Sequence, residues 1–259
     1  MASQASDKVD RIRKKAESSL FAFAKLMNPR RLYGTIHKEI FEWLGKESCD
    51  LNQLLLLPRG HMKSHCLAVY AAWQVTVDPA TTILYMSATS TLAEQQLYSI
   101  KGMLDSDIYR RSWPEMLQRD DGKREKWTNT SISVDHPERK AEGVRDPTIA
   151  TAGLTTNTAG WHASIIIPDD VVVPDNAYTG EGRRKCAAAM SQISSIKNAG
   201  GKIKACGTRY HPKDQYSIWK EQVEPIYDDN DELIGESPIW EVMERVVEVD
   251  GEFLCPRSS

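Results

Sequence analysis

Apolar residues recur with a helical period near the start of the chain and gather into short unbroken runs further on. The helical period covers about residues 8–27 and again 36–46, and Pro29 and Gly34 mark a turn between them. Four consecutive leucines then end at Pro58, a pattern typical of a strand buried on both faces of a parallel sheet. The pattern therefore predicts two helices followed by a buried strand.

Strand-like runs and helical segments alternate from there to about residue 208. Ser90 is the expected N-cap of one helix, and the polar stretch 105–147 offers one short strand candidate, SISV. Such alternation is typical of an α/β fold, a mainly parallel central sheet flanked by helices, here with an N-terminal helical segment. Helices are expected at 63–77, 90–104 and 175–198, and strands at 81–89, 148–154, 163–170 and 200–208.

The composition is that of an ordinary globular protein. Of 259 residues, 41% are hydrophobic and 27% are charged, and 33 basic residues against 36 acidic ones give a net charge of −3. This balance argues against a surface that is basic throughout, but it is compatible with a local basic groove for nucleic acid. Five dispersed cysteines without a C-x-x-C pair disfavour a disulfide scaffold or a zinc module. No apolar run approaches the roughly 20 residues of a membrane span, so we expect a soluble protein of a reducing cytoplasm.

A candidate phosphate-binding loop follows the leucine strand directly. Residues 58–65 read PRGHMKSH, and Lys63 and Ser64 stand where the next helix is expected to begin. In such a loop the backbone N–H groups face a phosphate, the lysine reaches the β- and γ-phosphates, and the serine ligates Mg²⁺. The match to G-x-x-x-x-G-K-[ST] is partial because Leu57 and Met62 replace the two glycines. A plain helix start with an exposed serine is the alternative interpretation.

An acidic pair, Asp169 and Asp170, follows three isoleucines at the end of an expected strand. Open α/β sheets bind ligands at the carboxyl ends of their strands. In nucleotide hydrolases the first acid of such a pair holds Mg²⁺, and the second orients or deprotonates the attacking water. Adjacent carboxylates also repel each other unless a cation neutralises them, which favours a metal site. An Asp-rich turn that caps the next helix is the alternative.

A third expected strand end carries Gly207 and Thr208. A hydroxyl at the tip of a strand beside a phosphate site can sense the γ-phosphate, whereas an exposed loop threonine is the alternative. Because all three features follow strands and come in this order, the sequence favours nucleotide hydrolysis over the three alternatives taken separately.

Four segments together resemble the ATPase part of the large terminase subunit, the DNA-packaging motor of tailed double-stranded DNA phages. They are LLLLPRGHMKSH, YMSATSTLAEQQL, TAGWHASIIIPDDVV and ACGTRYHP, and FAFAKLMNPRRLYGTIHKEIFEWL is similar to the family's adenine-binding segment. The resemblance spans about residues 20–256 and implies a P-loop NTPase fold of the RecA type. It implies a helical, adenine-binding segment at 1–50, an ATPase core at 51–220, and an extension toward a nuclease domain at 221–259.

The resemblance also implies roles for individual residues, with ATP and Mg²⁺ as cofactors. Met62 replaces a usual glycine, and Asp170 stands where many members have glutamate. The implied catalytic residues are Lys63, Asp170 and Arg59. The implied metal ligands are Ser64 and Asp169, and the implied coupling motif is Gly207 and Thr208. The loop implied to contact ATP consists of Pro58, Arg59, Gly60, His61, Met62, Lys63, Ser64 and His65.

The implied activity is ATP hydrolysis that drives double-stranded DNA into a procapsid. The family acts as a homo-oligomeric ring, expected to have five subunits, on the portal protein and together with a small terminase subunit. The implied location is the host cell cytoplasm, transiently at the portal vertex, and not the mature virion or a membrane. An arginine finger acting in trans is expected at Arg139 or Arg145, with Arg110 and Arg111 behind them.

The family's nuclease domain cuts DNA with a cluster of acidic residues that binds two metal ions. That cluster has no credible place in this sequence, so we expect no nuclease activity. An excised ATPase domain and a natural protein without the cutting domain both fit this expectation. Two other functions remain open: a non-hydrolysing DNA- or portal-docking module with a decayed nucleotide site, and a helicase-like ATPase. The basic clusters that could touch DNA phosphates are Lys123/Arg124/Lys126, Arg183/Arg184/Lys185 and Lys197/Lys202/Lys204.

Overall fold

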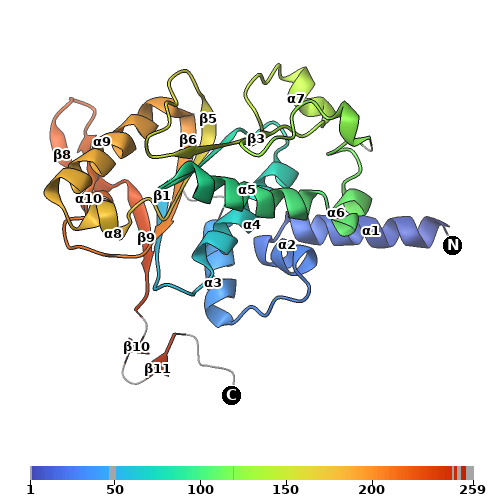
Figure 1. Cartoon of the computed structure of the whole chain (residues 1–259), viewed down its shortest axis with the longest axis horizontal. Helices are drawn as coiled ribbons and strands as arrows, with labels where there is room; N and C mark the ends of the chain where they lie inside the picture. The colour runs from blue at the N-terminus through green and yellow to red at the C-terminus, as the bar shows by residue number, and fades with distance from the viewer. Residues whose placement is uncertain (1, 47–50, 119, 247, 250–251, 255–259) are drawn as a thin grey trace.

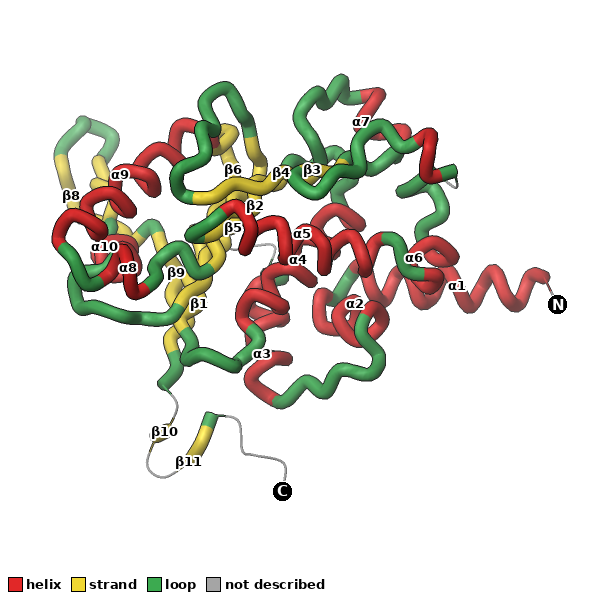
Figure 2. The backbone as a smooth tube through the Cα atoms, in the orientation of Figure 1, coloured by secondary structure: helices red, strands yellow, loops and turns green. Residues whose placement is uncertain are grey.

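A seven-stranded sheet forms the centre of the protein (Figures 1 and 2). The computed structural model describes residues 2–46, 51–118, 120–246, 248–249 and 252–254. The strand order is β3-β4-β2-β5-β6-β1-β9, and every neighbouring pair is parallel except β3 and β4. The strands are β1 (Asn52–Leu56), β2 (Ile83–Ser87), β3 (Ser131–Ile132), β4 (Ile149–Gly153), β5 (Ala163–Asp169), β6 (Lys197–Gly207) and β9 (Trp240–Glu244). The predicted α/β class with a mainly parallel sheet is confirmed.

Helices cover both faces of this sheet, and the sheet separates two hydrophobic clusters. One cluster combines the N-terminal helices with α4 and α5, and the other combines α9 and α10 with the opposite face. The helices are α1 (Ala2–Glu17), α2 (Leu20–Met27), α3 (Thr35–Leu44), α4 (Lys63–Val77), α5 (Ser90–Leu104), α6 (Asp107–Ser112), α7 (Pro137–Ala141), α8 (Pro174–Ala177), α9 (Gly180–Ile196) and α10 (Gln215–Glu221).

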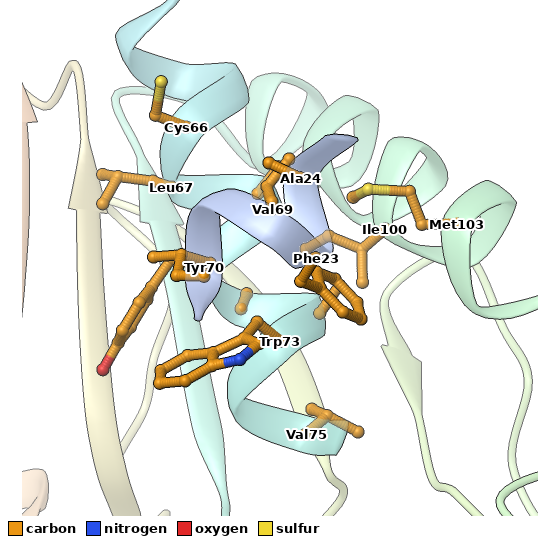
Figure 3. Packing of buried hydrophobic residues seen from close by; sticks show 14 of the residues in the cluster. Phe23, Ala24, Cys66, Leu67, Val69, Tyr70, Trp73, Val75, Ile100 and Met103 are labelled. Atoms are coloured by element: carbon orange, nitrogen blue, oxygen red, sulfur yellow. The ribbon is translucent and has the colours of Figure 1, made fainter. Parts of the chain in front are cut away.

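Helix α4 is the most deeply enclosed helix of the site. It lies between the sheet and helices α2 and α5, and its residues Leu67, Val69 and Trp73 are buried (Figure 3). Phe23 of α2 packs in the same cluster, and truncating a buried aromatic of this kind to alanine costs about 3–5 kcal/mol. The packing holds the first turn of α4, and with it the candidate phosphate loop, against the carboxyl ends of the strands.

Two predicted long helices are each divided, and the predicted N-cap shifts by one residue. The expected helix at 8–27 breaks because Ser19 caps a new helix, accepting a hydrogen bond from the Ala22 backbone N–H at 3.3 Å. The expected helix at 175–198 breaks at Thr179, whose hydroxyl accepts from the Gly182 N–H at 3.0 Å. Thr89, not Ser90, caps α5. Serine and threonine caps thus override a continuous apolar period.

The polar stretch and the C-terminal segment hold elements that the apolar pattern does not predict. SISV contributes only the two-residue strand β3, and the stretch also contains α6, α7 and the 3₁₀ turn Asp121–Lys123. In the segment assigned to an extension, β9 pairs with β1, and β7 (Val223–Tyr227) forms a hairpin with β8 (Leu233–Pro238). A smaller antiparallel pair joins β10 (Glu248–Val249) and β11 (Glu252–Phe253).

Within the described ranges, no helix combines the length and the apolar character needed to cross a bilayer. Cys66, Cys186 and Cys206 are buried free thiols. Cys49 and Cys255 lie outside the described residues, as do parts of the predicted 1–50 and 221–259 segments.

Candidate active site

Three neighbouring strands bring the sequence-predicted site together at one edge of the sheet. In the order β5-β6-β1, the central strand ends at the Gly207–Thr208 pair, β5 ends at the acidic pair, and β1 leads into the loop 58–65. The carboxyl ends of parallel strands meet at one sheet edge, where α/β folds place their ligands. The three predicted features are therefore parts of a single site, although 105 residues separate Ser64 from Asp169.

The loop before α4 turns sharply through left-handed backbone conformations. Gly60 has φ 84° and Met62 has φ 52°, and α4 begins at Lys63. For a residue with a Cβ this region costs about 1–2 kcal/mol, which explains why glycine is the residue expected at position 62. The Arg31 guanidinium lies 3.3 Å from the Met62 sulfur, so this side chain faces the N-terminal segment.

Lys63 and Ser64 each contact one member of the acidic pair. The Nζ of Lys63 lies 3.1 Å from Oδ2 of Asp170, and the lysine is only 6% exposed. The Ser64 hydroxyl donates to Oδ1 of Asp169 at 2.8 Å. The alternative of an exposed serine at a plain helix start is therefore wrong in this structure.

Asp169 is a buried carboxylate surrounded by donors. Burial is the main cause that raises its pKa, and hydrogen bonds from Cys206, Ser64 and Tyr85 act in the opposite direction. The Tyr85 hydroxyl donates to Oδ2 at 2.9 Å, and the Cys206 thiol lies 3.0 Å from Oδ1. Sequence reasoning missed Tyr85 and Cys206, because only the register of β2, β5 and β6 shows that they face the acid.

Asp170 has a backbone conformation and a side chain that suit a reacting group. Its φ is 45°, and its backbone N–H donates to the Cys206 carbonyl at 3.0 Å. Among the residues that the structure describes, its buried Oδ1 has no hydrogen-bond partner. A buried carboxylate oxygen without a donor is costly, so this atom is an open position for a water molecule or a hydrated cation.

The donor set fits Mg²⁺-bound ATP. Carboxylate, hydroxyl and water oxygens are the ligands that Mg²⁺ prefers, and Ser64 and Asp169 supply the first two. The lysine and the helix N-terminus supply positive charge for phosphates. The orphaned Asp170 oxygen lies beside them, so the residues present can hold the group that the sequence implied.

The residues predicted to couple, Gly207 and Thr208, contact the start of the candidate phosphate loop. The Gly207 carbonyl accepts from the Leu57 N–H at 3.2 Å, and the Thr208 hydroxyl donates to the Leu57 carbonyl at 3.3 Å. Tyr216 of α10 packs directly on Gly207, and its hydroxyl donates to the Cys206 carbonyl at 3.2 Å. Sequence reasoning missed Tyr216, which no motif marks.

Arg59 and His61 lie at the outer side of the loop. Arg59 is exposed and hydrogen-bonds the Tyr210 hydroxyl, with its guanidinium carbon 5.4 Å from the centre of that ring. His61 Nδ1 contacts the Arg59 carbonyl at 3.1 Å. In this structure Arg59 thus faces the loop after β6 and contacts neither member of the acidic pair.

His65 connects the loop to the N-terminal segment. Its Nε2 lies 2.9 Å from the Tyr33 hydroxyl, and the two rings are stacked with centres 6.0 Å apart. Burial, followed by Arg31 and His37, lowers the pKa of His65 to about 4, and burial raises the pKa of Tyr33 to about 12. The segment predicted to bind adenine therefore packs directly on the phosphate loop.

The finger candidates differ sharply in their surroundings. Arg139 is only 6% exposed, and its guanidinium donates to the carbonyls of Pro79, Thr81 and Asp146 at 3.1, 2.9 and 2.6 Å. This buried position corrects the expectation for Arg139, because an arginine finger acting in trans must extend from its own subunit into the nucleotide site of the next one.

Arg145 and Arg111 are exposed, whereas Arg110 is half-buried and paired with Asp105. Arg145 lines a cavity of about 600 Å³ together with Lys126 and His162. Of the four predicted arginines, Arg145 and Arg111 therefore keep the exposure that a finger needs.

Two members of the predicted DNA-contacting clusters are also buried. The Arg124 side chain is 2% exposed, pairs with Asp105 at 2.7 Å and lies over the Trp127 ring. Lys204 is 4% exposed and hydrogen-bonds Gln53. Neither can reach DNA in this conformation, because both side chains are buried and bonded to partners within the protein.

Comparisons with known proteins support the resemblance in sequence and in fold. No family model matches the chain. The large terminase subunit of Enterobacteria phage T3 is 25% identical over 138 residues, 53% of this chain and 22% of that subunit. The large terminase ATPase domain of Thermus phage P74-26 has a TM-score of 0.50 at 11% identity, covering 85% of this chain and 84% of that domain. The fold is that of a large terminase ATPase domain.

The likeness to large terminases is partial in length. The matched region of this chain spans about a fifth of the phage T3 subunit. The match therefore does not assign the activity of the whole subunit to this chain. The large terminase of bacteriophage HK97 gives a TM-score of 0.48 at 12% identity over 74% of this chain and 36% of that one, too low to add support.

Proposed function

We propose that this protein hydrolyses ATP and thereby powers the movement of double-stranded DNA into a viral procapsid. The observation that carries the proposal is the convergence of Lys63 and Ser64 with Asp169 and Asp170, through contacts of 3.1 and 2.8 Å. Phosphoryl transfer depends on positioning and charge neutralisation, and this arrangement supplies both from four side chains.

Each residue has one role in the proposed reaction. Lys63 leaves its ion pair with Asp170 and contacts the β- and γ-phosphates, while the first turn of α4 offers its N–H groups to the same anion. Asp170, released from the lysine, accepts a hydrogen bond from the attacking water, orients it and takes its proton. Bound Mg²⁺, held by Ser64 and Asp169, supplies charge neutralisation at the phosphate oxygens.

The change of partner for Lys63 links nucleotide binding to activation of the acid. In the structure Lys63 pairs with Oδ2 of Asp170 and leaves Oδ1 without a donor. A γ-phosphate competes for the lysine and thereby frees Oδ2 as well for the attacking water. In the proposal, Thr208 and Gly207, which bond Leu57 at the start of the loop, transmit this exchange to β6 and α10.

The remaining parts of the proposal rest on the likeness to large terminases. We propose a ring of subunits on a portal protein, assisted by a small terminase subunit and acting in the host cytoplasm. Arg145 or Arg111 of one subunit then serves the nucleotide site of the next. DNA binding by the isolated chain is expected to be weak and to decrease steeply with salt, given the net charge of −3.

The test is ATP turnover and nucleotide binding by Lys63→Ala, with Lys140→Ala as the control. Lys140 is an exposed lysine of α7 and lies outside the loop 58–65, the segment implied to bind adenine and the three basic clusters. We expect Lys63→Ala to lower turnover on the order of 10²–10³-fold and the control to leave it unchanged. Turnover is measured with and without double-stranded DNA at several protein concentrations, because a finger in trans requires assembly.

Two outcomes would overturn the proposal. Undiminished turnover by Lys63→Ala would remove this site from the reaction. Tight nucleotide binding with no turnover under any condition, by the unsubstituted chain, would instead support a non-hydrolysing docking module.

A further inference from the structure

The carboxylate of Asp169 receives hydrogen bonds on both oxygens from three different elements. Ser64 of α4 and Cys206 of β6 contact Oδ1 at 2.8 and 3.0 Å, and Tyr85 of β2 contacts Oδ2 at 2.9 Å. Tyr85 and Cys206 have no exposed surface, and Asp169 is 2% exposed. Two of the three donors are therefore fully enclosed by protein in this structure.

Sheet register explains why these two side chains meet the acid. Cys206 is the direct register partner of Asp169 across β5 and β6. On the other side of β5, Asp169 pairs with Ser87 of β2, and Tyr85 lies two residues earlier on the same face. The acid thus has a donor from each neighbouring strand, one for each oxygen. Rotation of the carboxylate about the Cβ–Cγ bond would break the hydrogen bonds from Tyr85 and Cys206.

Burial makes these donors significant for the orientation of the acid. A buried carboxylate without hydrogen bonds is strongly disfavoured, and a hydroxyl or thiol donor fixes the plane of the group as well as stabilising it. Ser64 is at the mouth of the site and is itself an expected ligand, so it exchanges its hydrogen bond when a cation arrives. Tyr85 and Cys206 are behind the carboxylate and can keep theirs.

We propose that Tyr85 and Cys206 are positioning residues that orient the Asp169 carboxylate for the divalent cation that accompanies the nucleotide. This inference rests on the proposed function, because it assumes that Asp169 and Ser64 hold that cation. Neither positioning residue contacts the cation. Outer hydrogen-bond partners of metal ligands typically change metal affinity by 10–100-fold when they are removed.

The test is a titration of Mn²⁺ into the whole chain in the presence of ADP, followed by electron paramagnetic resonance of free and bound Mn²⁺. We expect Tyr85→Phe and Cys206→Ala each to weaken Mn²⁺ binding about 10-fold or more. Cys206→Ser keeps a donor and is expected to bind Mn²⁺ within about threefold of the unsubstituted chain. ADP affinity in EDTA is expected to stay the same in all variants.

The matched control is Tyr109→Phe. Tyr109 is equally buried, and its hydroxyl makes a 2.9 Å hydrogen bond to Thr76, away from the acidic pair. Thermal unfolding measures whether the loss of a buried hydroxyl lowers the stability of Tyr85→Phe and Tyr109→Phe by the same amount. Mn²⁺ affinity should fall only in the first.

The outcomes separate this inference from the proposed function. If Asp169→Asn weakens Mn²⁺ binding but Tyr85→Phe and Cys206→Ala do not, the positioning role is wrong and the metal site stands. If Tyr109→Phe weakens binding as much as Tyr85→Phe does, the effect is one of packing and the inference also fails. If Asp169→Asn has no effect, the metal assignment within the proposed function is itself overturned.

Discussion

The ring of Tyr216 occupies the space that a side chain on Gly207 would need. A Cβ built at residue 207 would overlap the Cζ, Cε2 and Oη atoms of that ring. The Tyr216 hydroxyl also donates to the carbonyl of Cys206, directly before Gly207, and accepts from the N–H of Val172, two residues after Asp170. Residue 207 is therefore a glycine because of close packing and not because of a positive φ.

Gly207→Ala is expected to destabilise the protein and to disturb the coupling between β6 and α10. Overpacking of this kind costs about 1–3 kcal/mol, which equilibrium urea unfolding will measure. Gly102→Ala is the control, because a Cβ there meets no atom within 4 Å and alanine is favoured in a helix by roughly 1 kcal/mol. A Gly207→Ala variant as stable as the unsubstituted chain would contradict the packing argument.

Asp170→Asn is expected to abolish turnover while it preserves nucleotide binding. Asparagine tolerates the left-handed backbone at φ 45° and has nearly the same shape, so the fold should persist. It cannot accept a proton from water, and it no longer pairs with Lys63 as an anion. We expect a decrease in turnover of at least about 100-fold, with equal or tighter binding of ATP measured by calorimetry. Turnover within a few-fold of the unsubstituted chain would exclude Asp170 as the acid that orients water.

Arg139→Ala is expected to lower the stability of the fold, whereas Arg145→Ala is expected to lower turnover. Loss of Arg139 leaves three carbonyls without their donor and should lower the unfolding free energy by roughly 3 kcal/mol. Loss of the exposed Arg145 should change it by less than about 0.5 kcal/mol. If Arg145 acts in trans, a mixture of Arg145→Ala with Lys63→Ala should regain part of the turnover that neither variant has alone. No recovery in the mixture would count against Arg145 and leave Arg111 as the next arginine to test.

Acidification is expected to destabilise the fold through His65 and His37. Burial is the main cause that lowers both pKa values from 6.5, to about 4 for His65. The unfolded chain therefore binds more protons than the folded one below pH 6.5, and stability decreases as pH falls toward 4. Urea unfolding at pH 7.5, 6 and 5 measures this slope, and His65→Gln should make it shallower. Unchanged stability across this range would show that the two imidazoles are accessible to protons in the folded state.

The residues that the sequence marks are those whose chemistry depends on local order along the chain. Lys63 and Ser64 come after the short loop that follows a buried strand, and Asp169 ends another strand, so hydrophobic runs are enough to bring them to the same sheet edge. Tyr85 and Cys206 could not be predicted in this way. They become neighbours of Asp169 only through the strand order β2-β5-β6, which the hydrophobic pattern does not determine.

Tertiary contacts that a sequence pattern does not show also explain the errors at Arg139 and Arg124. Both lie in charged, polar stretches that predict exposure, yet each guanidinium enters the interior to satisfy carbonyl or carboxylate oxygens. β9 was missed for another reason. It is an edge strand with intermediate burial, so its sequence lacks the continuous apolar run that identifies β1.

Two consecutive carbonyls at the end of β6 point to opposite neighbours. The Cys206 carbonyl accepts from the Asp170 N–H at 3.0 Å, and the Gly207 carbonyl accepts from the Leu57 N–H at 3.2 Å. A pull of β6 along its own axis would therefore load both bonds at once, one toward the acid and one toward the phosphate loop. In mechanical terms, a load on β6 would be shared by both sides of the proposed nucleotide site, and Tyr216 of α10 contacts one of the two carbonyls that would carry it.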